Sequence, residues 1–125
     1  MDDGEFVKRV ILADRSQESR HHLKELLEKK NCSVVEALDG EDAVRKSSNG
    51  NYDALILDLS LPTLDGFQVI SILQKREVDI PIIVMSGKFD KDKIFKLMQY
   101  GVNAILAKPI SKRKLDDVFD RFVRG

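Results

Sequence analysis

Short apolar runs alternate along the chain with longer segments in which apolar residues recur every three or four positions. The runs at 10–13, 54–57, 80–85 and 103–107 have the length and composition of buried strands. The run at 33–38 is less apolar and is broken by Glu36, as an edge strand would be. The segments between and after them have the spacing of amphipathic helices. This alternation predicts a parallel sheet with helices on both faces, because each strand must return over the sheet through a helix.

The predicted fold is α/β: a doubly wound five-stranded parallel sheet of order 2-1-3-4-5, the flavodoxin-like (βα)5 arrangement. Its switch point lies between the first and third strands. Helices are expected to begin after Ser16, Asp90 and Ser111, whose side chains can accept a hydrogen bond from the first helical turn. The apolar faces of the last two helices are predicted to consist of Ile94, Leu97, Met98, Leu115, Val118, Phe119 and Phe122.

Composition fits one folded domain, 1–125, with 42% hydrophobic and 34% charged residues, and no effector domain is expected within it. Lys plus Arg equals Asp plus Glu, 21 each, which argues against a dedicated nucleic-acid binder. Cys32 is the single cysteine, so no internal disulfide can form. The chain has no apolar run of about 18 residues and no apolar signal core near Met1, so we expect a cytoplasmic protein without membrane insertion.

Polar side chains follow four of the apolar runs. Asp14 and Arg15 follow the first, Asp58 the third, Ser86 the fourth and Lys108 the fifth. An unpaired charge buried inside a strand costs several kcal/mol, so Asp58 must lie at the carboxyl end of the strand, where a partner or water can reach it. Because the carboxyl ends of parallel strands share one edge of the sheet, these groups are expected to meet around one crevice.

This pattern resembles the receiver domain of bacterial response regulators over nearly the whole chain. The segments that carry the resemblance are Asp14, Asp39-Gly40, Asp58 with Leu61-Pro62 and Asp65-Gly66, Ser86-Gly87, and Lys108-Pro109. Asp58 resembles the family's phosphoacceptor and Ser86 its Thr/Ser switch position. Lys108 resembles its invariant lysine, which precedes a proline through a cis bond.

The resemblance implies a signal-transduction domain of a two-component phosphorelay rather than a conventional enzyme. Asp58 would accept a phosphoryl group from a histidine kinase or phosphotransfer protein, Lys108 would pair with a phosphoryl oxygen, and Ser86 would donate a hydrogen bond to another. A downstream protein would then bind the face formed by the fourth helix, fifth strand and fifth helix. Direct binding of nucleic acid is not expected.

The resemblance also implies a Mg²⁺ site at Asp14, Asp58 and the backbone carbonyl of Ser60. Arg15 stands where the family has a second acidic residue, and a guanidinium has five donors and no acceptor, so it cannot be a ligand. Either Arg15 extends into solvent and leaves a weakened metal site, or it reaches Asp58 or Asp14 as a built-in cation. The alternative function is therefore a phosphorylation-independent, receiver-like interaction module.

Two enzyme classes are disfavoured by the residues. A dehalogenase-like phosphatase needs a second aspartate two positions after its nucleophile, and that position is Ser60. Neither the phosphate-binding loop G-x-x-x-x-G-K-[ST] nor the dinucleotide fingerprint G-x-G-x-x-G occurs. The neighbouring His21 and His22 face different sides of a helix, so they do not form a metal pair and are expected to be solvated.

Ile105 is a second departure from the family, which usually has Tyr or Phe at this place on the fifth strand. An aliphatic side chain has no polar tip that could turn between a dry and a wet position. We therefore expect a signal from the site to reach the surface of the fourth helix, fifth strand and fifth helix weakly or by another route.

Overall fold

The elements alternate as the sequence predicts in the computed structural model, which describes residues 7–123. The strands are β1 (Lys8–Ala13), β2 (Cys32–Ala37), β3 (Ala54–Asp58), β4 (Ile82–Ser86) and β5 (Ala104–Ala107). The helices are α1 (Gln17–Lys29), α2 (Gly40–Asn49), α3 (Gly66–Lys75), α4 (Lys91–Gln99) and α5 (Lys112–Phe122). β4 begins later than the predicted residue 80, because Pro81 has no N–H to donate to the sheet.

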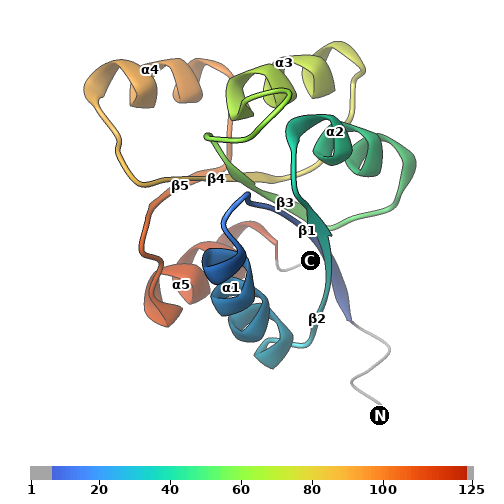
Figure 1. The fold of residues 1–125 in the computed structure, drawn as a ribbon, viewed down its shortest axis with the longest axis vertical. Coiled ribbons are helices and arrows are strands. Elements are labelled where there is room, and N and C mark those ends of the chain that lie inside the picture. The colour runs from blue at the N-terminus through green and yellow to red at the C-terminus, as the bar shows by residue number, and fades with distance from the viewer. Residues whose placement is uncertain (1–6, 124–125) are drawn as a thin grey trace.

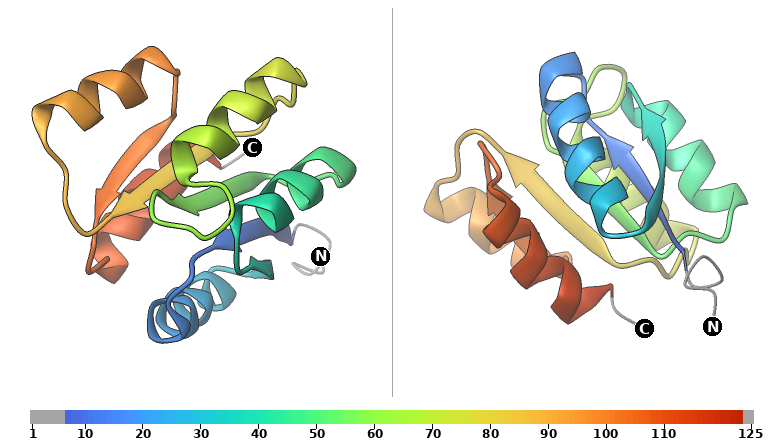
Figure 2. Two further views of the ribbon diagram at one scale, coloured as in Figure 1. Left: turned by 45° about the horizontal axis from the view of Figure 1, so that its top comes forward. Right: turned by 90° about the horizontal axis from the view of Figure 1, so that it is seen from below.

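All neighbouring strands run parallel, in the order β2-β1-β3-β4-β5. The helices α1 and α5 cover one face of the sheet, and α2, α3 and α4 cover the other (Figure 1, Figure 2). The predicted doubly wound fold is confirmed. Because the chain crosses from β1 to opposite sides of the sheet, a crevice opens at the carboxyl ends of β1 and β3.

The core lies in two layers, one on each face of the sheet. Every residue of β3 and of β4 is buried, as expected for central strands covered on both faces. Cys32 belongs to the layer under α1 and α5, and burial raises the pKa of its thiol to about 11. The thiol therefore stays protonated at neutral pH and acts as a small core side chain.

The predicted helix starts are confirmed by their hydrogen bonds. The side chains of Ser16, Asp90 and Ser111 each accept a hydrogen bond from a backbone N–H in the first turn of α1, α4 and α5. None of the helices between residues 7 and 123 has the length and apolar content that crossing a bilayer requires.

The apolar faces of α4 and α5 are buried less completely than the pattern predicts. Leu97 alone is buried among the described residues of α4, whereas Ile94 is 38%, Phe95 64% and Met98 68% exposed. In α5, Leu115 and Phe119 are buried, and Val118 is half-buried and packs against the core as predicted. Phe122 is half-buried as well, so it is less enclosed than predicted. Both helices lie beside β5, the edge strand of the sheet on this side.

Candidate functional site

One ammonium group joins two carboxylates at the carboxyl edge of the sheet. Lys108 Nζ lies 3.0 Å from Asp14 Oδ2 and 2.6 Å from Asp58 Oδ2, although these residues are 94 and 50 positions away along the chain. Asp14 is 0% and Asp58 6% exposed. The strand pairing explains the meeting, because Ala13 pairs with Leu57 and thereby places the next residue of each strand at the same edge.

The second oxygen of each carboxylate accepts a backbone N–H. Asp14 Oδ1 accepts from Ser16 and Asp58 Oδ1 from Ser60, both at 2.9 Å. Arg20, in α1, donates from its guanidinium to the backbone oxygen of Asp14 at 2.9 Å. These bonds orient both acids toward Lys108 and leave no carboxylate oxygen without a donor.

The start of α3 fixes the loop that follows Asp58. Asp65 caps the helix, and its neighbour Gly66 donates its N–H to the carbonyl of Leu59 at 2.9 Å. A Cβ on Gly66 would lie 2.8 Å from Leu59 Cα and 3.1 Å from the carbonyl oxygen of Asp58. Glycine is therefore required at this position, because the helix passes so close to the backbone of the loop.

Electrostatics keep Lys108 charged. Burial alone would lower the pKa of its ammonium group, but the hydrogen bonds to Asp58 and Asp14 and the charges of these acids outweigh burial and raise the pKa. Lys108 is thus a fixed positive charge at neutral pH, placed where both acids meet.

Ser86 ends β4 at the same edge, yet its hydroxyl faces its own turn. The hydroxyl donates to the carbonyl of Lys88 at 3.0 Å and accepts the Lys88 N–H at 3.2 Å. Ser86 touches the cluster through the backbone, because its carbonyl accepts the N–H of Lys108 at 2.9 Å. Ser86 therefore lies at the predicted edge of the sheet, and its hydroxyl is bonded within the turn after β4.

Arg15 is exposed, and within residues 7–123 its side chain makes no hydrogen bond, ion pair or ring contact. Of the two alternatives predicted for Arg15, the structure shows the first: its side chain extends into solvent. The alternative in which Arg15 reaches Asp58 or Asp14 was wrong, because Lys108 already pairs with both acids.

A sequence model of the response regulator receiver domain family matches residues 10–120. The chain belongs to this family. As a receiver domain it is a signalling domain of two-component systems, and the expected cis bond between Lys108 and Pro109 is present.

Relatives and solved structures agree with this assignment. The chain is 30% identical to transcription factor SKN7 of Saccharomyces cerevisiae, over 92% of this chain and 18% of SKN7. It is also 30% identical to the transcriptional regulatory protein PrrA of Mycobacterium tuberculosis, over 87% of this chain and 47% of PrrA. The receiver domain therefore spans less than half the length of these relatives.

The receiver domain of sensor histidine kinase PA1611 from Pseudomonas aeruginosa superposes with a TM-score of 0.87 at 25% identity, over 95% of this chain and 99% of that one. That domain was crystallised with a magnesium ion coordinated in its active-site cleft. Chemotaxis protein CheY4 of Vibrio cholerae has the same fold, with a TM-score of 0.85 at 22% identity over 93% and 98% of the two chains.

The charges around this site fit a magnesium ion poorly. Mg²⁺ demands near-octahedral oxygen coordination, usually through one or two carboxylates and several waters. Each oxygen of Asp14 and Asp58 accepts one hydrogen bond and keeps a further lone pair, but the positive charges of Lys108, between the two acids, and of Arg15, next to Asp14 in the chain, oppose a divalent cation. Within residues 7–123, no three His, Cys, Asp or Glu side chains gather as a metal site.

Two contacts near the site were missed by sequence reasoning. Arg20 joins the backbone of Asp14 to Glu36, whose carboxylate lies 3.0 Å from its guanidinium. His22, expected to be solvated, is exposed, but its Nε2 lies 3.1 Å from the carbonyl of Ile110. Because a backbone carbonyl can only accept, Nε2 carries a proton in this contact. The one sequence signal for Arg20 was its position in the first turns of a helix that follows Asp14.

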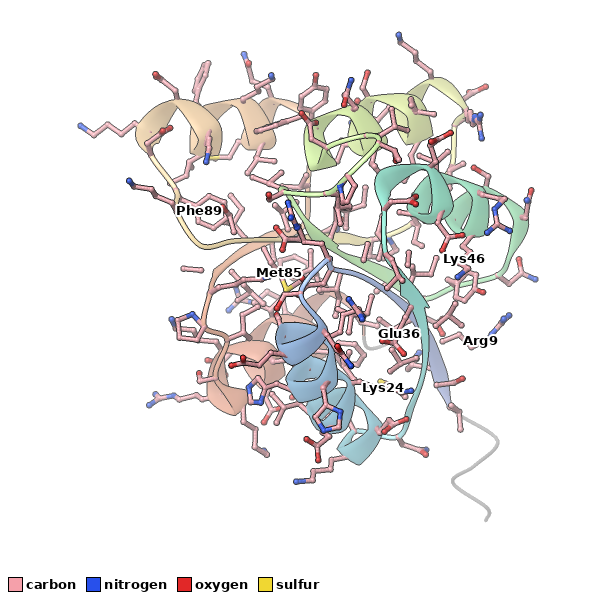
Figure 3. The ribbon with its side chains drawn as sticks, in the orientation of Figure 1. Arg9, Lys24, Glu36, Lys46, Met85 and Phe89 are labelled. Carbon is pink, nitrogen blue, oxygen red and sulfur yellow. The ribbon has the colours of Figure 1, made fainter. Side chains whose placement is uncertain are left out.

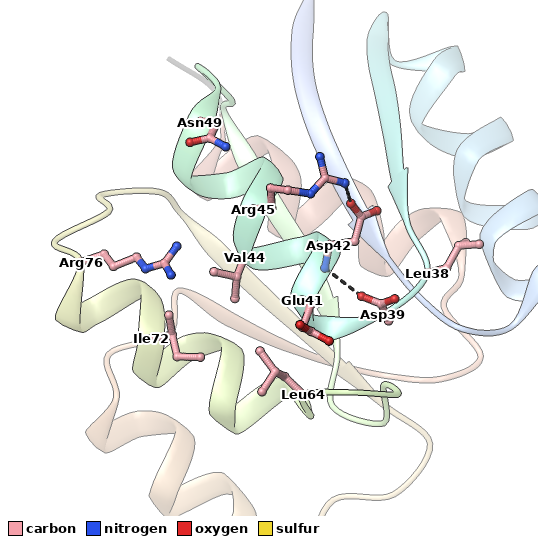
Figure 4. A pocket seen from close by; sticks show the side chains of 10 residues that line it. All are labelled: Leu38, Asp39, Glu41, Asp42, Val44, Arg45, Asn49, Leu64, Ile72 and Arg76. Atoms are coloured by element: carbon pink, nitrogen blue, oxygen red, sulfur yellow. Dashed lines mark hydrogen bonds and ion pairs between the residues drawn. The ribbon is translucent and has the colours of Figure 1, made fainter.

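An open groove of about 810 Å³ between α2 and α3 is separate from the site. Its apolar floor includes Leu64 and Ile72, and an ion pair between Arg45 and Asp42 crosses its wall (Figure 4). None of the strand-end residues Asp14, Asp58, Ser86 and Lys108 lines this groove.

Proposed function

We propose that this receiver domain accepts a phosphoryl group on Asp58 from a histidine kinase or phosphotransfer protein and then binds a downstream protein with altered affinity. The observation that carries the proposal is the placement of Lys108 Nζ between Asp14 and Asp58 at the sheet edge. A carboxylate held beside a fixed cation is a suitable phosphoryl acceptor, since catalysis of this transfer is mainly positioning and neutralisation of charge.

In the reaction, a carboxylate oxygen of Asp58 attacks phosphorus and forms a new O–P bond. The bond between phosphorus and the donor breaks, and its electron pair leaves with the donor. The leaving group is acetate when acetyl phosphate is the donor. When phosphohistidine is the donor, the leaving group is its imidazole, which takes up a proton from water. Asp58 becomes a neutral acyl group carrying a dianionic phosphoryl, and Lys108 then pairs with a phosphoryl oxygen.

A pocket of about 400 Å³ beside Lys108 supports approach of the donor from this side. It opens between α1 and the loop after Pro109, and Ser16, Ser19 and His22 line its helical wall. A donor docked against α1 would thus reach the rim of the site without disturbing the sheet.

The exposed apolar residues of α4 support the proposal that a downstream protein binds this face of the domain. Ile94, Phe95 and Met98 reach solvent on one helix, and contiguous exposed apolar surface marks interaction sites. We place the partner on the face that α4 forms with β5 and α5.

Labelling with acetyl phosphate tests the proposal. The protein is expected to gain the mass of one phosphoryl group, and Asp58→Asn is expected to abolish the gain because it removes the nucleophile. Asp117→Asn, at an exposed aspartate of α5, is the matched control and should label like the native chain. Intact-mass spectrometry after incubation with and without Mg²⁺ is the measurement.

A receiver-like module that works without phosphate is the second candidate. It is favoured by Arg15 and by the pairing of Lys108 with both Asp14 and Asp58, because the formal charges of these four residues sum to zero before any phosphoryl group arrives. If the native chain gains no phosphoryl group under either condition, phosphate acceptance is rejected and this candidate stands.

A further inference from the structure

The formal charges at the strand ends balance without a metal ion. Asp14 and Asp58 carry two negative charges, Lys108 carries one positive charge within hydrogen-bond distance of both, and Arg15 follows Asp14 directly. An aspartate in place of Arg15 would lower this local charge by two units. That is the amount that a divalent cation restores.

We propose that the guanidinium of Arg15 binds the incoming phosphoryl group and takes the place of a divalent cation, so that Asp58 is phosphorylated without Mg²⁺. This inference rests on the proposed function, and it names Arg15 as a further catalytic residue of that site.

Arg15 has the chemistry for this role. Its planar guanidinium presents paired N–H donors that match two phosphoryl oxygens, and it stays protonated at all physiological pH values. It neither gives nor takes a proton in the step, so the balance of the transfer to Asp58 is unchanged. Preorganised cations around a transferring phosphoryl group stabilise the charge that develops there.

The surroundings of Arg15 leave its side chain available while they hold its backbone. The residue before Arg15, Asp14, donates its N–H to the carbonyl of Ala37 at 3.2 Å. The residue after it, Ser16, donates its N–H to Asp14 Oδ1 at 2.9 Å. The guanidinium is exposed and has no partner among residues 7–123, so it gives up no interaction when it turns to a phosphoryl oxygen.

The metal-binding alternative is weaker on the same observations. A divalent cation at the carboxylates would be repelled by the ammonium of Lys108, which already pairs with both acids, and by Arg15. Arg15 supplies positive charge with no ion bound between Lys108 and the acids.

The test compares rates of labelling by acetyl phosphate in excess EDTA and in Mg²⁺. The native rate is expected to differ by less than about threefold between the two, and Arg15→Gln should slow labelling in EDTA by about 10- to 100-fold, as loss of one charge-stabilising donor does. Arg15→Asp should label only with Mg²⁺. Lys88→Gln, at an exposed cation after β4 on the same sheet edge, is the matched control and should keep the native rate.

Binding of Mg²⁺ alone gives a second readout. Amide chemical shifts around Asp58 are expected to move on titration of Arg15→Asp with MgCl₂ and to stay in place for the native chain at the same concentrations. Far-UV circular dichroism confirms that the variants are folded, which the exposure of Arg15 leads us to expect.

The outcomes separate this inference from the proposed function. Native labelling that requires Mg²⁺ overturns the role of Arg15 and leaves Asp58 as acceptor. An Arg15→Gln variant as fast as the native chain in EDTA, or a Lys88→Gln variant as slow as Arg15→Gln, also overturns it. Absence of labelling under both conditions rejects the function and the inference together.

Discussion

At the scale of single residues, the site depends on one lysine between two buried acids. Asp14 and Asp58 lie at the carboxyl ends of the neighbouring strands β1 and β3, and Lys108 pairs with both and supplies the charge that offsets the cost of burying them. Removing one partner of a buried charge cluster is far more costly than removing the cluster as a whole, because the remaining charges lose their compensation.

We therefore expect Lys108→Met to lower the free energy of unfolding at neutral pH by about 2–4 kcal/mol. The double variant Asp58→Asn with Lys108→Met should recover part of this loss, since one of the two facing charges is gone. Urea unfolding of the two single variants and the double variant measures the coupling. Additive losses would mean that Lys108 and Asp58 do not interact energetically.

The sequence predicted the meeting of Asp14, Asp58 and Lys108 because parallel strands bring their carboxyl ends to one edge. It did not predict the hydrogen bonds of Ser86 and Arg20. Strand-end position follows from the pattern of apolar runs, whereas a hydroxyl or guanidinium chooses among nearby partners that only the three-dimensional path of the turns defines.

At the scale of elements, α1 is joined to the edge strand β2 by a small ionic network. Glu36 of β2 accepts from Arg20 at 3.0 Å and from Lys24 at 3.5 Å (Figure 3 labels Lys24 and Glu36). Burial alone would raise the pKa of Glu36, but the hydrogen bond from Arg20 and the charge of Lys24 outweigh it and lower the pKa. β2 is an edge strand, as predicted, and Glu36 also holds the helix that begins beside Asp14.

Because its pKa is lowered by folding, Glu36 stabilises the fold above the ordinary glutamate pKa of about 4.3, and this contribution is lost as pH falls through the lowered value. Glu36→Gln should cost less than about 1 kcal/mol at neutral pH, since the carboxylate is partly exposed, and should flatten the acid side of the stability profile. Urea unfolding between neutral and acid pH measures it. Glu18→Gln, on the exposed face of α1, should keep the native profile, and an unchanged slope in Glu36→Gln would contradict the assignment.

Element order was predictable because strand runs and helical periodicity differ in period, and the caps at Ser16, Asp90 and Ser111 followed from local chemistry alone. Burial on α4 was not predictable in the same way. An apolar stripe states which side of a helix prefers the core, but the width of the covered stripe depends on where the helix lies, and α4 lies over the β5 edge of the sheet.

At the scale of the whole molecule, the site and the exposed face of α4 must communicate across β4 and β5. Ile105 is half-buried and packs against the core layer that includes Leu97 and Val84. It carries no polar tip whose position could report the state of the site. The expected consequence is a weak response on β5 when Asp58 is modified.

Amide chemical shifts before and after labelling with acetyl phosphate test this expectation. We expect small changes at Ile105 and Met98 and larger ones between Ser86 and Asp90. Ile105→Tyr, which adds a ring with a polar tip, should enlarge the change at 105 and serves as the comparison. Large shifts around Ile105 and Met98 in the native chain would contradict the expectation.

The turn after β4 gives this expectation a structural basis. A serine hydroxyl has one hydrogen, and Ser86 gives it to the carbonyl of Lys88, which also accepts the ammonium of Lys93 in α4 at 3.1 Å. If Ser86 turned toward a phosphate, the N–H and carbonyl of Lys88 would each lose a partner, and the first turn of α4 would have to rearrange. The effect of phosphorylation would then pass through the backbone of this turn into α4, which exposes Phe95, and it would not require a change in β5.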